Sequence, residues 1–104
     1  MTTKQLTVTG FMTIQPGTEQ TLLPQIDALV AKTRAEPGCI NYDFHQHNAD
    51  PYRFVFYENF VNQAAFDAHF AQPHTQEWIA LAEAHGARFD IQKWTVLSQP
   101  DRSR

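Results

Sequence analysis

The sequence has little cysteine, no long apolar run and no clustered positive charge. Cys39 is the only cysteine among 104 residues, so one chain can form neither an internal disulfide nor a cysteine-based zinc site. No stretch approaches the roughly 18 consecutive apolar residues of a membrane span, and the first residues lack the apolar core of a secretory signal. We therefore expect no membrane partner and a cytoplasmic location.

The charge balance and the missing motifs exclude further classes. The net charge is -3 and the eight Lys and Arg residues are scattered, whereas a nucleic-acid partner requires a clustered basic surface. Gly-rich phosphate loops, a G-x-S-x-G elbow and an H-E-x-x-H motif are absent from the sequence. His45 and His47 alternate along one segment, but two histidines without a third ligand do not define a metal site. No metal and no nucleic acid are predicted.

Length and composition fit one domain over residues 1–104. A 42% share of hydrophobic residues is enough for one core and leaves no room for a second. The core is expected to span about residues 5–97, with the polar segment 98–104 as a frayed tail. Cys39 is expected to be a small core residue at the start of a strand, because free cysteine is usually buried and inert.

Apolar periodicity predicts a strand–helix–strand–strand–helix–strand order, with the second helical region in two pieces. The predicted elements are strands at 4–14, 39–47, 52–60 and 89–97, and helices at 18–35, 62–70 and 74–85. Pro24 predicts a kink or a later start of the first helix, and Asn62 is a good N-cap. The order βαββαβ is that of the ferredoxin-like α+β fold, a four-stranded antiparallel sheet with helices on one face.

The segment 52–60 carries apolar bulk on both faces of the predicted strand, because Phe54 and Phe56 alternate with Val55 and Tyr57. Helices can cover only one face of the sheet. The residues left on the other face are Phe11, Val55, Tyr57, Trp94 and Val96. They would form an exposed patch in a monomer, and a second copy is the simplest cover, so a homodimer is predicted.

One carboxyl group and two imidazoles are predicted to face an aromatic interior. Glu58 shares a strand face with the aromatic residues of 52–60, where burial would raise its pKa unless it has a partner. His69 lies on the apolar stripe of the helix at 62–70, and His74 opens the next helix. Spacing alone leaves a purely structural interpretation open, since a histidine in such a stripe is often a satisfied core residue.

Four segments carry a likeness to a known family. They are Glu36-Pro-Gly-Cys-Ile-Asn-Tyr42, Arg53-Phe-Val-Phe-Tyr-Glu58, Ala64-Ala-Phe-Asp-Ala-His69 and Gln72-Pro-His74. Together they resemble the antibiotic biosynthesis monooxygenase family over about residues 5–97, and most of all its quinol monooxygenase and autoinducer isomerase branch. The resemblance implies a dimeric ferredoxin-like α/β barrel with a pocket between sheet and helices, and an activity without a cofactor. The haem-cleaving branch fits less well, because its Asn, Trp and His combination is not evident.

The predicted function is a cofactor-independent monooxygenase that oxidises a small phenol or quinol with O2. A base would remove a proton from the substrate, and the resulting anion could donate an electron to oxygen. His69 is the predicted base, oriented by Glu58, and His74 would bind the substrate oxygen or act as the alternative base. The choice between the two histidines is open. The predicted substrate-binding walls are Tyr42, Phe54, Phe56, Phe66 and Trp78.

Two other functions are compatible with the same residues. An isomerase would use the same base to move a proton on a small hydroxy-ketone signal molecule. A dimeric domain without catalysis would bind an aromatic ligand, or none, and would keep Glu58 and His69 as a buried structural pair. Fold alone does not decide between these functions.

Overall fold

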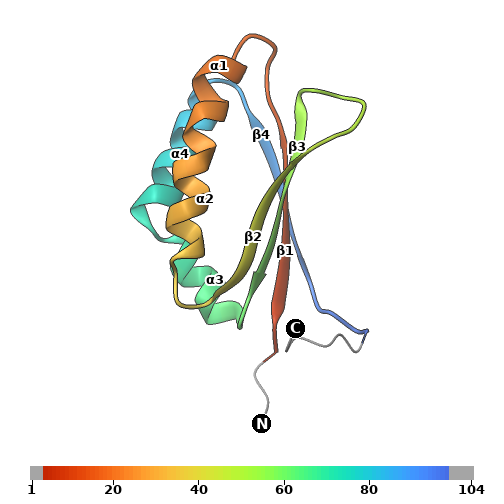
Figure 1. Cartoon of the computed structure of the whole chain (residues 1–104), viewed down its shortest axis with the longest axis vertical. Helices are drawn as coiled ribbons and strands as arrows, with labels where there is room; N and C mark the ends of the chain where they lie inside the picture. The colour runs from red at the N-terminus through yellow and green to blue at the C-terminus, as the bar shows by residue number, and fades with distance from the viewer. Residues whose placement is uncertain (1–3, 99–104) are drawn as a thin grey trace.

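The computed structural model describes residues 4–98 and has two layers, with all helices on one face of a single sheet (Figure 1). The elements are β1 (Leu6–Thr13), α1 (Glu19–Leu22), the 3₁₀ turn η1 (Leu23–Gln25), α2 (Ile26–Arg34), β2 (Cys39–Gln46), β3 (Arg53–Phe60), α3 (Gln63–Phe70), α4 (Pro73–Ala84) and β4 (Arg88–Trp94). The strands pair antiparallel in the order β2-β3-β1-β4. This is the predicted ferredoxin-like α+β fold. No helix within residues 4–98 is long and apolar enough to cross a bilayer.

The first helical region and the last strand are the most informative places to compare the structure with the sequence prediction. The kink predicted at Pro24 is confirmed, because this residue lies in η1 between α1 and α2 and proline cannot donate an i→i−4 hydrogen bond. The last strand ends at Trp94 rather than residue 97. Its final pair joins Trp94 to Thr7 near the start of β1, so Val96 has no strand beside it. The predicted polar tail lies, apart from Ser98, outside the described residues.

A β-bulge at the start of β2 shapes the inner face of the sheet. Cys39 pairs with Phe60 and Asn41 with Asn59, so Ile40 is the extra residue. The bulge lets Cys39 and Tyr42 both face the helices although they are three positions apart. Cys39 is half-buried, and burial together with the nearby Glu36 carboxylate raises the pKa of its thiol to about 11. The thiol is therefore protonated at neutral pH, as expected for a packing residue.

The opposite face of the sheet carries both apolar and polar groups. The side chains of Phe11, Tyr57 and Trp94 are 39%, 40% and 48% exposed there. Phe11 lies directly across from Val55, which is half-buried. The indole of Trp94 donates a 2.8 Å hydrogen bond to the hydroxyl of a neighbouring β1 residue, Thr9. Four of the five residues predicted to remain uncovered thus lie on this face, whereas Val96 comes after the end of β4.

Candidate active site

A cavity between the inner face of the sheet and helices α3 and α4 brings together most of the predicted site. Its volume is about 400 Å³ including its open mouth. Six of the eight predicted residues line it: Tyr42, Phe56, Glu58, Phe66, His69 and Trp78. The lining is mostly apolar, as in other small-molecule sites, with a few polar groups that converge.

Two predicted residues lie elsewhere. Phe54 does not line the cavity but stacks on Phe44 in the core, with ring centroids 5.1 Å apart. The prediction that His74 opens on the same cavity is wrong, because its side chain faces a separate hollow between α2 and α4. The buried face of α4 is set by residues such as Thr75 and Trp78, and this turns the preceding side chain toward α2.

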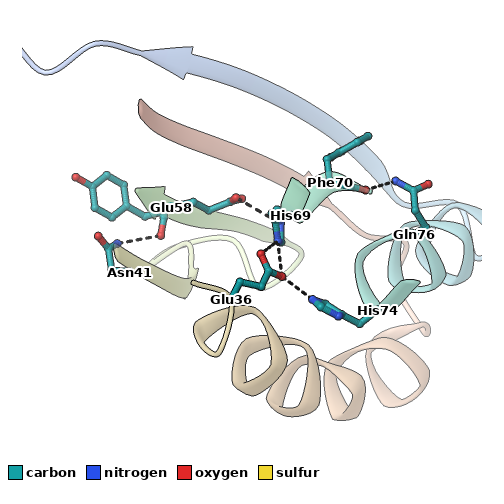
Figure 2. Close-up of polar contacts among 8 residues, drawn as sticks. Glu36, Asn41, Glu58, His69, Phe70, His74 and Gln76 are labelled. Atoms are coloured by element: carbon teal, nitrogen blue, oxygen red, sulfur yellow. Dashed lines mark hydrogen bonds and ion pairs between the residues drawn. The ribbon is translucent and has the colours of Figure 1, made fainter. Parts of the chain in front are cut away.

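His69 lies between two carboxyl groups, and only one is within hydrogen-bond distance. Its Nδ1 atom is 3.1 Å from both carboxylate oxygens of Glu36, while its Nε2 atom is 3.8 Å from Oε1 of Glu58 (Figure 2). The prediction that Glu58 orients His69 is therefore wrong, because Glu36 holds the imidazole instead. When Nδ1–H donates to Glu36, the lone pair of the neutral ring is on Nε2, on the side of Glu58.

Glu36 is the residue that the sequence analysis missed. It accepts from His69 and also lies 2.7 Å from Nε2 of His74, so one carboxylate joins two imidazoles (Figure 2). In the sequence Glu36 looked like part of a helix-ending Glu-Pro-Gly turn. The available signal was its position at the start of the family-like segment 36–42.

Gly38 holds the Glu36 turn close to α3. A Cβ atom at this glycine would overlap the Cβ of Ala65, so only glycine permits this approach. The Gly38 carbonyl accepts a 2.9 Å hydrogen bond from the backbone N–H of Val61, just before α3. His69 follows Ala65 by one helical turn, so this contact sets the distance between the imidazole and its carboxylate.

Burial gives Glu58 and His69 unusual protonation. Burial, and then the charge of Glu36, raises the pKa of Glu58 to about 8. Burial lowers the pKa of His69, and the neighbouring His74 adds to this effect while the hydrogen bond and charge of Glu36 oppose it. At neutral pH the pair is therefore mainly a carboxylic acid beside a neutral imidazole, which is an acid and a base in one cavity.

Aromatic rings and one glycine define the space around this pair. The rings of Tyr42 and Phe60 lie 5.4 Å and 5.1 Å from the imidazole of His69. Burial raises the pKa of the Tyr42 phenol, so it stays neutral. Gly10 lies beneath Glu58, where an added Cβ would be 3.4 Å from Oε2. A larger residue at this position would take space from the cavity.

Glu36 and its two histidine partners together offer the donors of a metal site. One ligand atom each from Glu36, His69 and His74 lie within 4.8 Å of one another. Carboxylate and imidazole donors of this kind suit zinc and other divalent transition metals. This donor set was not predicted, because Glu36, His69 and His74 follow no metal-binding spacing motif. His45 and His47 are not among these donors. Nδ1 of His47 instead accepts hydrogen bonds from the backbone N–H groups of Ala49 and Asp50 in the following turn.

Comparison with known proteins shows the family and the fold of the chain. The profile of the family described as antibiotic biosynthesis monooxygenase matches residues 5–81. A crystal structure described as an antibiotic biosynthesis monooxygenase is 36% identical, with a TM-score of 0.79 over 91% of this chain and 99% of that chain. The crystal structure of PA3566 from Pseudomonas aeruginosa is 30% identical, with a TM-score of 0.82 over 94% of this chain and 99% of that chain.

A curated relative is considerably longer. The uncharacterised protein sll1783 of Synechocystis is 30% identical over 74 residues, which make up 71% of this chain and 50% of that protein. The match therefore spans half the length of this relative.

Proposed function

Because the chain belongs to the antibiotic biosynthesis monooxygenase family, we propose that it is a cofactor-free monooxygenase that oxidises a small phenol or quinol with O2. One observation carries the proposal. A buried, neutral imidazole, His69, lines an apolar cavity while its Nδ1 is held by the carboxylate of Glu36. This is the arrangement of a general base with an orienting partner.

The first step is removal of a proton from the substrate hydroxyl by Nε2 of His69. The Glu36 carboxylate stabilises the imidazolium that forms and keeps the ring in the productive orientation. Glu58, as a carboxylic acid, can donate a hydrogen bond to the substrate oxygen as negative charge develops on it. His74 does not reach the cavity, so in this mechanism it acts through Glu36 as a positioning residue.

The substrate anion then supplies the electrons for oxygen chemistry. One electron passes from the anion to O2, and the substrate radical and superoxide combine into a carbon-bound peroxide. The proton held on His69 goes to the outer peroxide oxygen. His69 then removes the hydrogen of the peroxide-bearing carbon as a proton, and the electrons of that C–H bond form the carbonyl while the O–O bond breaks. The departing hydroxide takes up this proton and leaves as water. One oxygen atom remains on the substrate as a carbonyl and the other becomes water, so the substrate provides all four electrons. The apolar walls exclude competing water.

The test is oxygen uptake with a panel of hydroquinones and anthrones, followed by variants. His69→Ala should lower kcat by about 10²-fold or more, the scale of a general base. Glu58→Gln should cost less, because it keeps a hydrogen-bonding group of the same shape. Glu77→Gln, on the exposed face of α4, is the control and should have no effect. Full turnover in His69→Ala would exclude this residue as the base.

An isomerase is the second candidate, favoured by the acid and base 3.8 Å apart at Glu58 and His69. Such a pair can take a proton from one carbon of a hydroxy-ketone and deliver another to the adjacent carbonyl oxygen. NMR of a hydroxy-ketone in deuterated water separates the two reactions, because only the isomerase would exchange the carbon-bound proton without consuming O2.

A further inference from the structure

Two buried polar atoms without hydrogen-bond partners in the described part of the chain belong to residues that line the cavity. Oε1 of Glu58 is on the sheet and Oγ1 of Thr75 is on α4, and both residues line the cavity. Glu58 is 6% and Thr75 4% exposed. Neither atom has a hydrogen-bond partner among residues 4–98. A third such atom, in Thr33, does not belong to the cavity lining.

An unsatisfied buried hydroxyl is costly, and the hydroxyl of Thr75 makes no hydrogen bond within residues 4–98. Thr75 lies on the buried stripe of α4 with Trp78 and Ala82, where valine would fill the same space without an unpaired polar group. Buried polar groups are almost always bonded to protein, water or ligand. The absence of a partner for the hydroxyl within the described chain therefore points to a ligand atom in the cavity.

We propose that Thr75 is a second polar anchor, which binds a substrate oxygen on the side of the ring away from Glu58 and His69. The favoured substrates are then aromatic rings that carry oxygen at two opposite positions, as in 1,4-dihydroxyarenes, over rings with a single hydroxyl. The inference rests on the proposed function, since it assumes that the substrate occupies this cavity.

The chemistry of the two walls suits such a ring. The Thr75 hydroxyl can donate to a phenolic oxygen and equally to the carbonyl that replaces it on oxidation. Thr75 is also in the first turn of α4, two residues after Pro73, where the helix dipole favours an electron-rich oxygen. On the other wall, Glu58 and His69 engage the hydroxyl that loses its proton.

Calorimetric titration under argon with naphthalene-1,4-diol and with 1-naphthol tests the inference without any turnover. The wild type should bind the diol about tenfold more tightly, the scale of one buried hydrogen bond. Thr75→Val, which keeps the shape of the side chain, should remove this difference in affinity. It should weaken binding of the diol and leave the affinity for 1-naphthol within about twofold of the wild-type value. Thr75→Ser retains the hydroxyl and should keep most of the preference.

Three results would overturn the inference. They are equal affinity of the wild type for the two ligands, an unchanged ratio in Thr75→Val, and no binding of the diol at millimolar concentration. The first and third use only the wild type, so a poorly folded variant does not leave the question open. Oxygen uptake is measured separately. If the diol is preferred through Thr75 but no O2 is consumed, Thr75 is still a polar anchor for the ligand, and the proposed monooxygenase activity is wrong.

Discussion

Glu36 and Glu58 are carboxyl groups on two sides of the same imidazole, and their partners distinguish them. Glu36 accepts hydrogen bonds from His69 and His74, whereas Oε1 of Glu58 has no such partner within residues 4–98. The charge of one then disfavours ionisation of the other, adding to the burial of Glu58. Glu58 can then act as the acid of the mechanism, while the Glu36 carboxylate orients the base, His69.

The raised pKa of Glu58 predicts a specific dependence of stability on pH. Its pKa is about 8 in the folded state against an ordinary value of 4.5, so the folded chain holds this proton more tightly. The stabilisation is fully present below the ordinary value and is lost as the pH rises through about 8. Between about pH 6 and about pH 9 the melting temperature of the wild type should therefore fall by about 5 °C or more relative to Glu58→Gln.

The matched control for this experiment is Glu77→Gln, which removes an exposed carboxylate and should follow the wild type. The difference between variants matters rather than the absolute slope, because other groups also titrate in this range. If Glu58→Gln loses stability as steeply as the wild type, Glu58 is already ionised at neutral pH and cannot be the acid.

The Glu36, His69 and His74 cluster predicts a response to metal. Activity should be unaffected by a chelator, since the proposed reaction uses no metal. Added Zn²⁺ should inhibit, because binding at Nδ1 of His69 displaces the proton shared with Glu36 and draws electron density from Nε2. His74→Ala removes one donor and should raise the Zn²⁺ concentration for half-inhibition by about tenfold or more. Loss of activity on chelation, restored by one metal, would contradict the cofactor-free mechanism.

At the scale of elements, alternation in the sequence was enough to predict every strand and the face of Glu58. Period-two patterns report burial directly, and Pro24 reports a local backbone constraint. Contacts made by turns leave no such periodic pattern in the sequence. Glu36 reaches His69 only because the bulged β2 and the Gly38 turn approach α3, and no periodicity in the sequence encodes that approach. The prediction for His74 failed for a related reason, since its direction depends on how α4 rotates to bury Trp78.

The close contact between the Glu36 turn and α3 gives a test at this scale. Gly38→Ala should push α3 away from the turn, lengthen the Glu36–His69 contact and destabilise the fold by about 1–3 kcal/mol. Ala65→Gly removes the Cβ that the new methyl group would overlap. The double variant should therefore regain much of the lost stability and activity, even though glycine in a helix costs about 1 kcal/mol.

Thermal unfolding measures the stability, and oxygen uptake the activity, of the two single variants and of the double variant. Additive losses in the double variant would mean that the two sites are not coupled. The close approach of Gly38 to Ala65 would then have no part in positioning His69.

At the scale of the whole molecule, the helices leave one face of the sheet bare (Figure 1). Phe11, Tyr57 and Trp94 are partly exposed on it, while a buried asparagine on the same face, Asn59, is bonded to neighbouring side chains. Large apolar groups with satisfied polar groups around them are typical of protein interfaces. The face therefore has the composition expected of a protein–protein contact.

We predict a homodimer that joins the bare sheet faces. Sedimentation should show a dimer at micromolar concentration, and Val55→Lys should weaken it by about 10²-fold or more, because an unpaired charge in a desolvated contact costs about 3–5 kcal/mol. Ala31→Lys, on the exposed surface of α2, adds the same charge on the helical side and should leave the dimer intact. The cavity lies between the opposite face of the sheet and the helices, so ligand affinity in Val55→Lys separates assembly from the site. A wild type that sediments as a monomer would leave the apolar side chains of this face exposed and would remove the support for the two-sheet arrangement.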